Sequence, residues 1–363
     1  MPAFLAHFCI LDMAYSKLSE KSKFLIKEPR YQSSGKIHSA ELSQWAYLGA
    51  IGPDICGAEE TVEWVFDVIH WKKSNSFVAN WIEKLDPDFE EFSESVHLAF
   101  LFGFLSHMAG DTIVHPYVNT FAGVLDRQSI SVAVKKSPIP VPIFGIFGYA
   151  FPKAAHEAEM HRFVELHQDA YVAERYYGAK SLSAGDDALL SWNSFFRDAV
   201  KDQTHKKDYS GLLKRYVDVT NETYNVPSYK KALTNSYLEK AVNKICEVGL
   251  GLGYDGAMGP VPNHPEDIFV QHPKRDRNYD SYLWAAAFTT TKYWEAAMDF
   301  LYSPMDISDR KAFMKVIRNF NLDTGFAPRV YSNQNRIYIR HDHSWSLLLE
   351  KPTQAFDPEM PKK

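Results

Sequence analysis

The sequence predicts an all-α protein, a bundle of many helices with a large core. Residues 39–51 have apolar side chains at helical spacing and end at Gly52-Pro53, a pair that stops helices. The apolar segment 87–115 and the segment 154–173 predict two further helices with polar side chains at four-residue spacing. A chain of 363 residues with 45% hydrophobic content can bury a core of this size.

The segment that follows the first stop predicts two helices. One covers residues 61–82. The next begins at Asp86, a good N-cap residue, with Pro87 at the first helical position. We expect it to end at His115, because Pro116 biases the residue before it away from helical geometry.

The rest of the chain is less regular. Residues 137–153 form an apolar loop rich in Pro and Gly, which either packs as core or serves as a lid or substrate-facing wall. Residues 184–246 favour helices with polar loops, 251–265 a loop, and 281–302 one more helix. The alternation within 336–340 favours a short strand or hairpin.

Composition limits the classes of function. The formal net charge of -5 leaves no basic footprint for nucleic acid. Cys9, Cys56 and Cys246 lie far apart, which indicates reduced thiols rather than a disulfide framework. We see no secretory signal and no run of eighteen apolar residues, so we expect a cytoplasmic protein without a membrane span. We expect a helical core over 1–175 and a mostly helical region over 176–363, within one globule or beside it.

The most informative stripe is made by His107, Asp111 and His115. Residues four apart stack on one face of a helix, and the rest of this helix is apolar. Burying two imidazoles and a carboxylate costs free energy unless something pairs with them. A hydrogen-bonded pair on the helix surface is the plain alternative, and a metal ion is the simplest explanation for the whole stripe.

A second stripe strengthens this interpretation. His161 and Glu165 repeat the four-residue spacing, and Asp169 lies a further four residues on. Helical proteins build metal sites from side chains on facing helices. Imidazole and carboxylate ligands without Cys favour zinc, while iron and manganese accept the same set.

On these residues the sequence resembles the zinc-dependent phospholipase C family, whose fold is shared by the S1/P1 nucleases. The resemblance covers roughly residues 1–175. It rests on the segments 1–7, 48–54 and 103–117, and on the His161/Glu165 pair. It implies an all-α bundle with three zinc ions in a cleft. The secreted enzymes of the family also chelate zinc through an amino-terminal Trp, and this sequence has no such Trp.

The resemblance also implies a ligand set made only of histidines and carboxylates. One zinc would take Asp54, His70, His107 and Asp111, a second His7 and the shared Asp111, and a third His115, His161 and Glu165.

No motif surrounds His70, and His38 and His97 compete with it. Asp54 and Asp111 are the candidate catalytic carboxylates, because either could accept a proton from an attacking water.

The predicted function is therefore a metal-dependent phosphodiester hydrolase, most similar to phospholipase C, with two to three zinc ions. Its substrate would be a lipid or small-molecule phosphodiester, with peripheral membrane contact left open and no nucleic-acid partner. Three alternatives remain at this point. They are an S1/P1-like nuclease, which would want basic residues and stacking aromatics, a di-iron redox enzyme, whose usual Glu-x-x-His motifs are missing, and a helical protein with structural metal.

Overall fold

The computed structural model describes residues 4–17, 39–86, 92–122, 203–226, 230–255, 279–320 and Leu322, with short helical pieces at 164–165, 168–169, 171–172 and 175–176. Every regular element in this part of the chain is a helix, so the all-α prediction is confirmed. In chain order the elements are α1 (Phe4–Lys17), α3 (Ser39–Ala50), η2 (Gly52–Ala58), α4 (Glu63–Trp71), α5 (Ser74–Ile82), α6 (Phe92–Ala122), α10 (Gln203–Thr223), α11 (Asn235–Asp255), α12 (Tyr279–Leu301) and α13 (Ile307–Val316).

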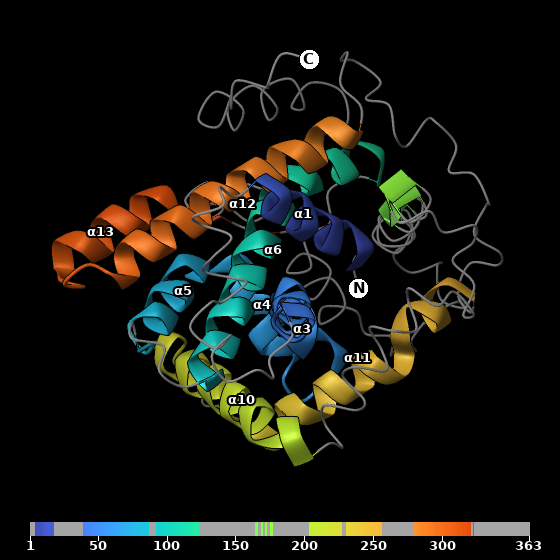
Figure 1. Cartoon of the computed structure of the whole chain (residues 1–363). Helices are drawn as coiled ribbons and strands as arrows, with labels where there is room; N and C mark the ends of the chain where they lie inside the picture. Colours follow the sequence, from blue (N-terminus) through green and yellow to red (C-terminus); the bar gives the residue numbers. More distant parts are fainter. Residues whose placement is uncertain are drawn as a thin grey trace, which may run out of the picture.

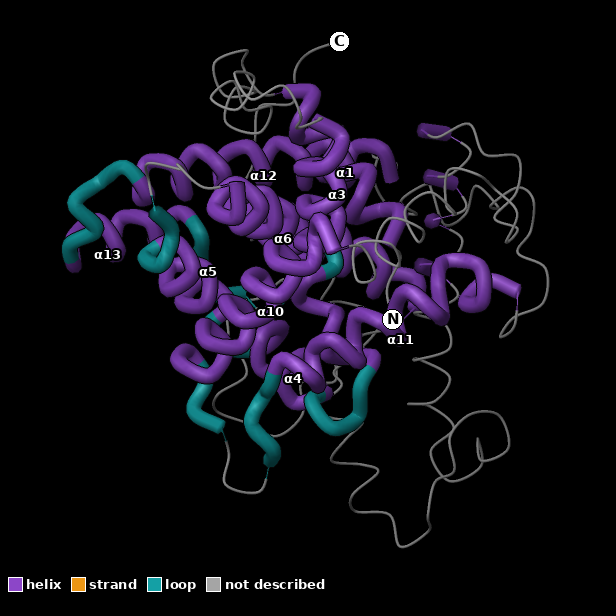
Figure 2. Tube along the Cα trace, turned by 60° about the horizontal axis from the view of Figure 1, so that its bottom comes forward, coloured by secondary structure: helices purple, strands orange, loops and turns teal. Residues whose placement is uncertain are grey.

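Helix α6 lies at the centre of the bundle. Helices α1 and α12 cover one side of it, and α10 and α11 lie on the opposite side (Figures 1 and 2). A helix that is apolar on nearly all sides belongs in a core. The stretch Ser95–His115 of α6 is long and apolar enough to cross a membrane, but 94% of that window is buried inside the protein. Its length and composition are therefore accounted for by the bundle core.

Aromatic side chains fill the seam between α5, α6 and α10. Trp81 stacks on Phe100 at 5.1 Å between ring centroids, and Phe77 stacks on Phe104 at 4.7 Å. Tyr216 of α10 meets Phe77 edge-on at 5.5 Å. Part of the high aromatic content thus serves the core, where such pairs stabilise beyond their buried area.

Glycines let α3 and α6 approach until their backbones touch. A Cβ atom on Gly103 would lie 1.9 Å from the carbonyl oxygen of Ala46 and 2.5 Å from the backbone nitrogen of Ala50. A Cβ on Gly49 would lie 1.9 Å from the carbonyl oxygen of Phe100. No other residue type fits at either position without moving a helix. This close crossing sets how near α3 comes to the polar stripe of α6.

The single helix predicted over 61–82 is wrong, because the chain turns between α4 and α5. Lys73 has a φ of 55°, in the left-handed region that interrupts a helix. The new helix begins at Ser74, whose backbone N–H and hydroxyl both donate to the side-chain oxygen of Asn319, each at 3.3 Å. A cap supplied from 245 residues away is invisible to local periodicity.

The prediction that the long helix ends at His115 is also wrong. Helix α6 continues through position 116 to Ala122. Proline inside a helix costs about 3 kcal/mol, but the turn after it is buried: Tyr117 packs on Tyr282 at 4.6 Å and on Tyr279 at 5.6 Å. Burial of a large apolar side chain contributes roughly 1.5–3 kcal/mol, so tertiary packing offsets the local preference.

The predictions for the second half of the chain are confirmed in part. Helix α12 confirms the prediction over 281–302, and α10 and α11 confirm helices within 184–246. The loop predicted over 251–265 is wrong at its start, because residues 251–255 are the end of α11. The apolar segment 137–153 and the strand predicted over 336–340 lie outside the described residues.

The second half of the chain packs directly on the first. Helix α12 contacts α1 and α6, α10 contacts α5, and α11 contacts η2. Tyr216 of α10 also donates a hydrogen bond to the carbonyl oxygen of Gly52 at 3.0 Å, which ties α10 to η2. The division at residue 175 stays a prediction.

Candidate metal centre

The structure gathers seven of the eight predicted ligands in one buried cluster. His7 comes from α1, Asp54 from η2, His70 from α4, and Glu165 from a short helical piece, while α6 supplies His107, Asp111 and His115. Each of the seven is at most 7% exposed. The eighth, His161, lies outside the described residues.

Asp111 stands in the middle of the cluster and faces four histidines. Its Oδ1 lies 3.3 Å from Nε2 of His7 and 3.4 Å from Nε2 of His115. Its Oδ2 lies 2.9 Å from Nε2 of His107 and 3.7 Å from Nε2 of His70. The two oxygens of one carboxylate therefore face two separate pairs of imidazoles.

Asp54 completes the side of the cluster near His70 and His107. Its Oδ1 lies 3.2 Å from Nε2 of His70 and 4.0 Å from Nε2 of His107. The stop at Gly52-Pro53 ends α3, and the following 3-10 turn, closed by the Asp54 N–H on the Ile51 carbonyl at 3.0 Å, aims this side chain inward. On the opposite side, Nε2 of His115 lies 3.5 Å from Oε1 of Glu165.

Three of the histidines are oriented by a hydrogen bond from Nδ1, the ring nitrogen that does not face the carboxylates. Nδ1 of His70 donates to the carbonyl of Phe66 at 2.9 Å, Nδ1 of His107 to Ala50 at 2.7 Å, and Nδ1 of His115 to Leu322 at 2.6 Å. A carbonyl oxygen only accepts, so Nδ1 must carry the hydrogen. In the neutral ring this leaves the lone pair of Nε2 facing the carboxylates, as in most metal-binding histidines.

Leu322 is a site residue that sequence reasoning missed. Besides accepting from His115, its backbone N–H donates to the carbonyl of His70 at 2.8 Å. One residue of the C-terminal half thus holds two histidines of the cluster. A backbone contact carries no side-chain signature, so nothing in the sequence could have indicated it.

The competing histidine His97 lies away from the cluster. His97 is on α6, where its carbonyl accepts from Nε1 of Trp81 at 3.2 Å and its ring faces α5 and α10. His38 lies outside the described residues. Of the two candidates that the structure describes, His70 lies in the cluster and His97 does not.

Asp169 has a different role from the one its spacing suggested. Its carboxylate accepts from the backbone N–H of Leu5 at 3.2 Å and of Ala6 at 2.9 Å, so it caps the first turn of α1. A negative charge at a helix N-terminus stabilises it. This cap fixes the end of α1 next to His7.

We expect Asp169→Ala to lower the free energy of unfolding by about 1–2 kcal/mol, the range for lost helix caps. Zinc affinity should fall as well, because the start of α1 carries His7. Chemical denaturation and a chelator competition titration would measure the two effects. Asp306→Ala is the matched control, since Asp306 caps α13 through Ser308 and Asp309 at the surface. An equal fall in zinc affinity in both variants would contradict this role.

The cluster shifts the pKa values of its members in opposite directions. Burial raises the pKa of Asp111, but the neighbouring His107 and His115 outweigh this and hold it well below its usual value. Burial lowers the pKa of His107, but the charges of Asp111 and Asp54 raise it above its usual value. Burial and the adjacent His107 lower the pKa of His7. Asp54 and Asp111 are therefore ionised at neutral pH, and His107 takes up a proton at a higher pH than His7 does.

Zinc affinity should consequently fall as the pH decreases. As a predicted zinc ligand, His107 must offer the lone pair of Nε2, and its protonation begins at a higher pH than that of an ordinary histidine because its pKa is raised. The low pKa of His7 delays its protonation to more acid solution. Competition titrations should show that zinc affinity weakens from about pH 8 to pH 6, because zinc must then displace a proton from the histidine. An affinity independent of pH over this interval would contradict the assignment of His107.

The donor set fits a metal ion. Within the described part of the chain, both oxygens of Asp54, both oxygens of Asp111 and Nε2 of His107 are buried without a partner in hydrogen-bond geometry, although ring nitrogens lie close by. Donor atoms of His70, His107 and Asp111 lie within 4.8 Å of one another, as do those of His7, Asp54 and His107. Donor atoms that each lie about 2.0–2.2 Å from one zinc ion are separated from one another by distances close to this limit. The convergence of donor atoms is what a shared cation would satisfy.

The fold and the cluster define an all-α protein with a candidate metal centre of histidines and carboxylates inside a helical bundle. A family model described as zinc-dependent phospholipase C matches residues 6–225, more than half of the chain. The chain belongs to the zinc-dependent phospholipase C family, as its sequence predicted. The match runs from α1 through α10, beyond the 1–175 segment on which the resemblance rested. No curated protein and no solved structure matches the chain.

Proposed function

We propose that this protein is a zinc-dependent phosphodiester hydrolase of the phospholipase C type, which acts on a phospholipid. Membership of the family supports the metal and the reaction class. The observation that carries the proposal is Asp111, whose two oxygens each face a separate pair of histidines. A carboxylate in this position can bridge two cations. The family match gives no support to the iron redox or nuclease alternatives.

The proposed ligand groups follow the two sides of Asp111. Asp54, His70 and His107 would hold one ion with Oδ2 of Asp111. His7 would hold a second ion with Oδ1 of Asp111. His115 and Glu165, with His161, would form the third group. Bound zinc ions polarise a phosphoryl oxygen and lower the pKa of a water to near neutrality.

Asp54 is the proposed general base. The ring nitrogens of His107 and His70 counteract the effect of burial and keep the pKa of Asp54 below its usual value, so it is ionised at neutral pH. Its side chain is 0% exposed, which shields an abstracted proton from bulk water. In this proposal Asp54 is both a ligand and the general base, whereas Asp111 is the bridge between two ions.

The first experiment measures metal content by inductively coupled plasma mass spectrometry on protein purified without chelator or metal affinity. The protein is then assayed with phosphatidylcholine in mixed micelles, for release of a phosphorylated head group. We expect two to three zinc ions per chain and hydrolysis that is lost with a chelator and restored by zinc.

Three other outcomes would contradict the proposal. Single-stranded DNA cleaved in preference to phospholipid would replace the proposal with a nuclease. Iron at two per chain, with no hydrolysis, would replace it with redox chemistry. Bound zinc with no turnover of any phosphodiester would overturn the hydrolase and leave a structural metal.

A further inference from the structure

His7 differs from the other three histidines of the cluster in its second ring nitrogen. His70, His107 and His115 each donate Nδ1–H to a backbone carbonyl. Among the described residues, Nδ1 of His7 has no hydrogen-bond partner, although it is buried. A metal-binding histidine almost always has such a partner, which fixes its tautomer and ring orientation. Stacking on His107 at 4.0 Å sets the plane of the His7 ring but not which nitrogen carries the hydrogen.

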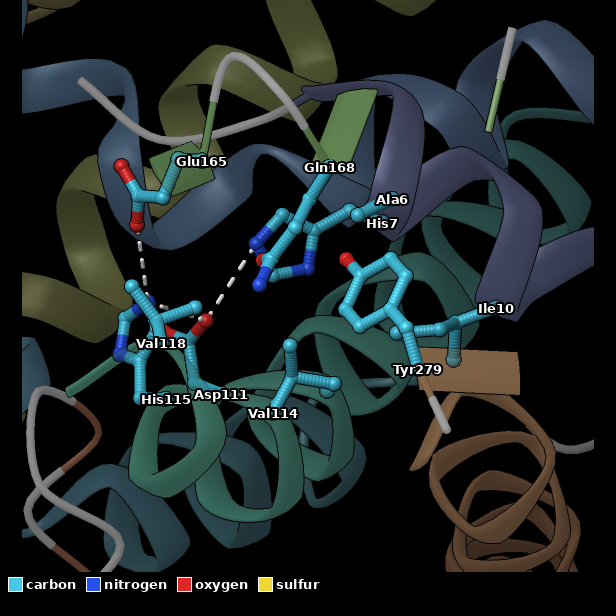
Figure 3. Close-up of a pocket in the computed structure, with 11 residues that line it drawn as sticks. Ala6, His7, Ile10, Asp111, Val114, His115, Val118, Glu165, Gln168 and Tyr279 are labelled. Carbon is cyan, nitrogen blue, oxygen red and sulfur yellow. Dashed lines mark ion pairs between the residues drawn. The ribbon is translucent and has the colours of Figure 1, made fainter. Parts of the chain in front are cut away.

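A small pocket lies beside His7 and contains two more polar side chains of this kind. Gln168 and Tyr279 line it together with His7, Asp111, His115 and Glu165 (Figure 3). Both are 0% exposed. Within the described part of the chain, neither atom of the Gln168 amide nor the Tyr279 hydroxyl has a hydrogen-bond partner. In Figure 3 the Gln168 side chain and the Tyr279 hydroxyl both point toward the His7 ring.

The size of the pocket fits a single water molecule. Its volume is about 20 Å³. A cavity needs roughly 10–15 Å³ to hold one water molecule, and that water needs two to four polar partners. The pocket therefore has room for a single water molecule. His7, Gln168 and Tyr279 are the lining residues whose buried polar atoms lack a hydrogen-bond partner among the described residues.

The backbone around the pocket is consistent with this occupant. Gly110 also lines it, and a Cβ atom there would lie 3.1 Å from Nδ1 of His7 and 3.1 Å from Cδ1 of Ile10. A side chain at position 110 would crowd the nitrogen that needs a partner. Gln168 lies three residues after Glu165, and both residues line the pocket.

We propose that Gln168 and Tyr279 are positioning residues that hold one ordered water against Nδ1 of His7. The water accepts the Nδ1 hydrogen of His7 and is held by the Gln168 amide and the Tyr279 hydroxyl. It thereby takes the place that a backbone carbonyl has at the other three histidines. The lone pair of Nε2 is then directed toward Asp111 and the ion near Oδ1. This inference rests on the metal centre of the proposed function.

The test compares Tyr279→Phe and Gln168→Leu with the matched control Tyr282→Phe. Tyr282 is on the same helix and packs on Tyr117, but its hydroxyl does not line the pocket. Zinc affinity is measured with a competing chelating dye, and the cobalt-substituted protein is examined by visible absorption. Both pocket variants should bind one ion per chain at least about tenfold more weakly. This is the lower end of the range observed when a metal-binding histidine loses the hydrogen-bond partner of its other ring nitrogen. Tyr282→Phe should bind as the wild type.

A second readout separates orientation of His7 from a general loss of structure. Nitrogen-15 NMR of the histidine rings reports which nitrogen carries the hydrogen. Wild-type His7 should show the Nδ1–H tautomer, and Tyr279→Phe should show a mixture, with the signals of His70 and His107 unchanged. Zinc affinity within twofold of wild type in both pocket variants would overturn the inference, as would an equal loss in Tyr282→Phe.

The outcomes also distinguish this inference from the proposed function. Wild-type protein that binds no zinc would overturn both. Zinc bound as expected, with pocket variants unaffected, would overturn only the role of Gln168 and Tyr279. Weakened zinc binding in the pocket variants of a protein that hydrolyses no phosphodiester would support the inference and refute the hydrolase.

Discussion

Asp111→Asn should lower phosphodiester hydrolysis by about 10³-fold or more, since loss of an ion that contributes several kcal/mol to transition-state stabilisation has an effect of this size. The asparagine side chain has nearly the same shape but no negative charge to face four histidines. At least one zinc ion per chain should be lost. The stability gained on adding zinc, about 4 kcal/mol at a thousand times Kd, should largely disappear. Metal analysis, the micelle assay and thermal unfolding with and without zinc measure these three effects.

The matched control for this change is Asp299→Asn. Asp299 lies on the exposed face of α12, so the same loss of charge there should leave zinc content and activity unaltered. An Asp111→Asn protein that kept its full zinc content and its activity would show that the carboxylate is not a bridge.

Gly103→Ala should destabilise the fold by about 3 kcal/mol or more, at the upper end of the usual effect of overpacking a core. The added Cβ atom would lie 1.9 Å from the carbonyl oxygen of Ala46, and backbone atoms cannot rotate away as a side chain can. Helices α3 and α6 must then separate. Their separation would also disturb the bond from His107 Nδ1 to the Ala50 carbonyl, 2.7 Å in length, so zinc affinity should fall with stability. Urea denaturation and dye competition measure the two effects.

Gly211→Ala provides a control of opposite sign. Among the described residues, a Cβ atom on Gly211 of α10 would meet only Nε2 of His97, at 3.8 Å, an ordinary contact. Replacing a helical glycine by alanine without a clash stabilises by up to about 1 kcal/mol. If both variants changed stability in the same direction, the close approach of α3 and α6 would not be the cause.

The metal centre shows where sequence reasoning succeeds and where it ends. The spacing of His107, Asp111 and His115 placed three donors on one helical stripe, and the structure brings all three to one cluster. The family resemblance added His7, Asp54 and His70 from three other elements, and these lie in the same cluster. Spacing alone could not have joined them, because the contacts cross between helices.

Asp169 shows the opposite case. Its spacing from Glu165 continued the ligand stripe, but its carboxylate caps α1. A carboxylate on a buried helix face can satisfy a cation or a set of backbone N–H groups, and the sequence around it is the same in both cases. Only the position of the N-terminus of α1 decides between them.

The sequence by itself determined the helical class of this protein, its family and the stripe of donors on α6, because helical periodicity and ligand spacing are local properties. The tertiary structure decided the rest. It broke 61–82 at Lys73, carried α6 past Pro116, and placed Leu322 between His70 and His115. Each of these depends on partners more than 150 residues away, such as Asn319 for α5 and Tyr279 for the end of α6. Contacts at that separation arise from the packing of the whole bundle, and no window of neighbouring residues contains them.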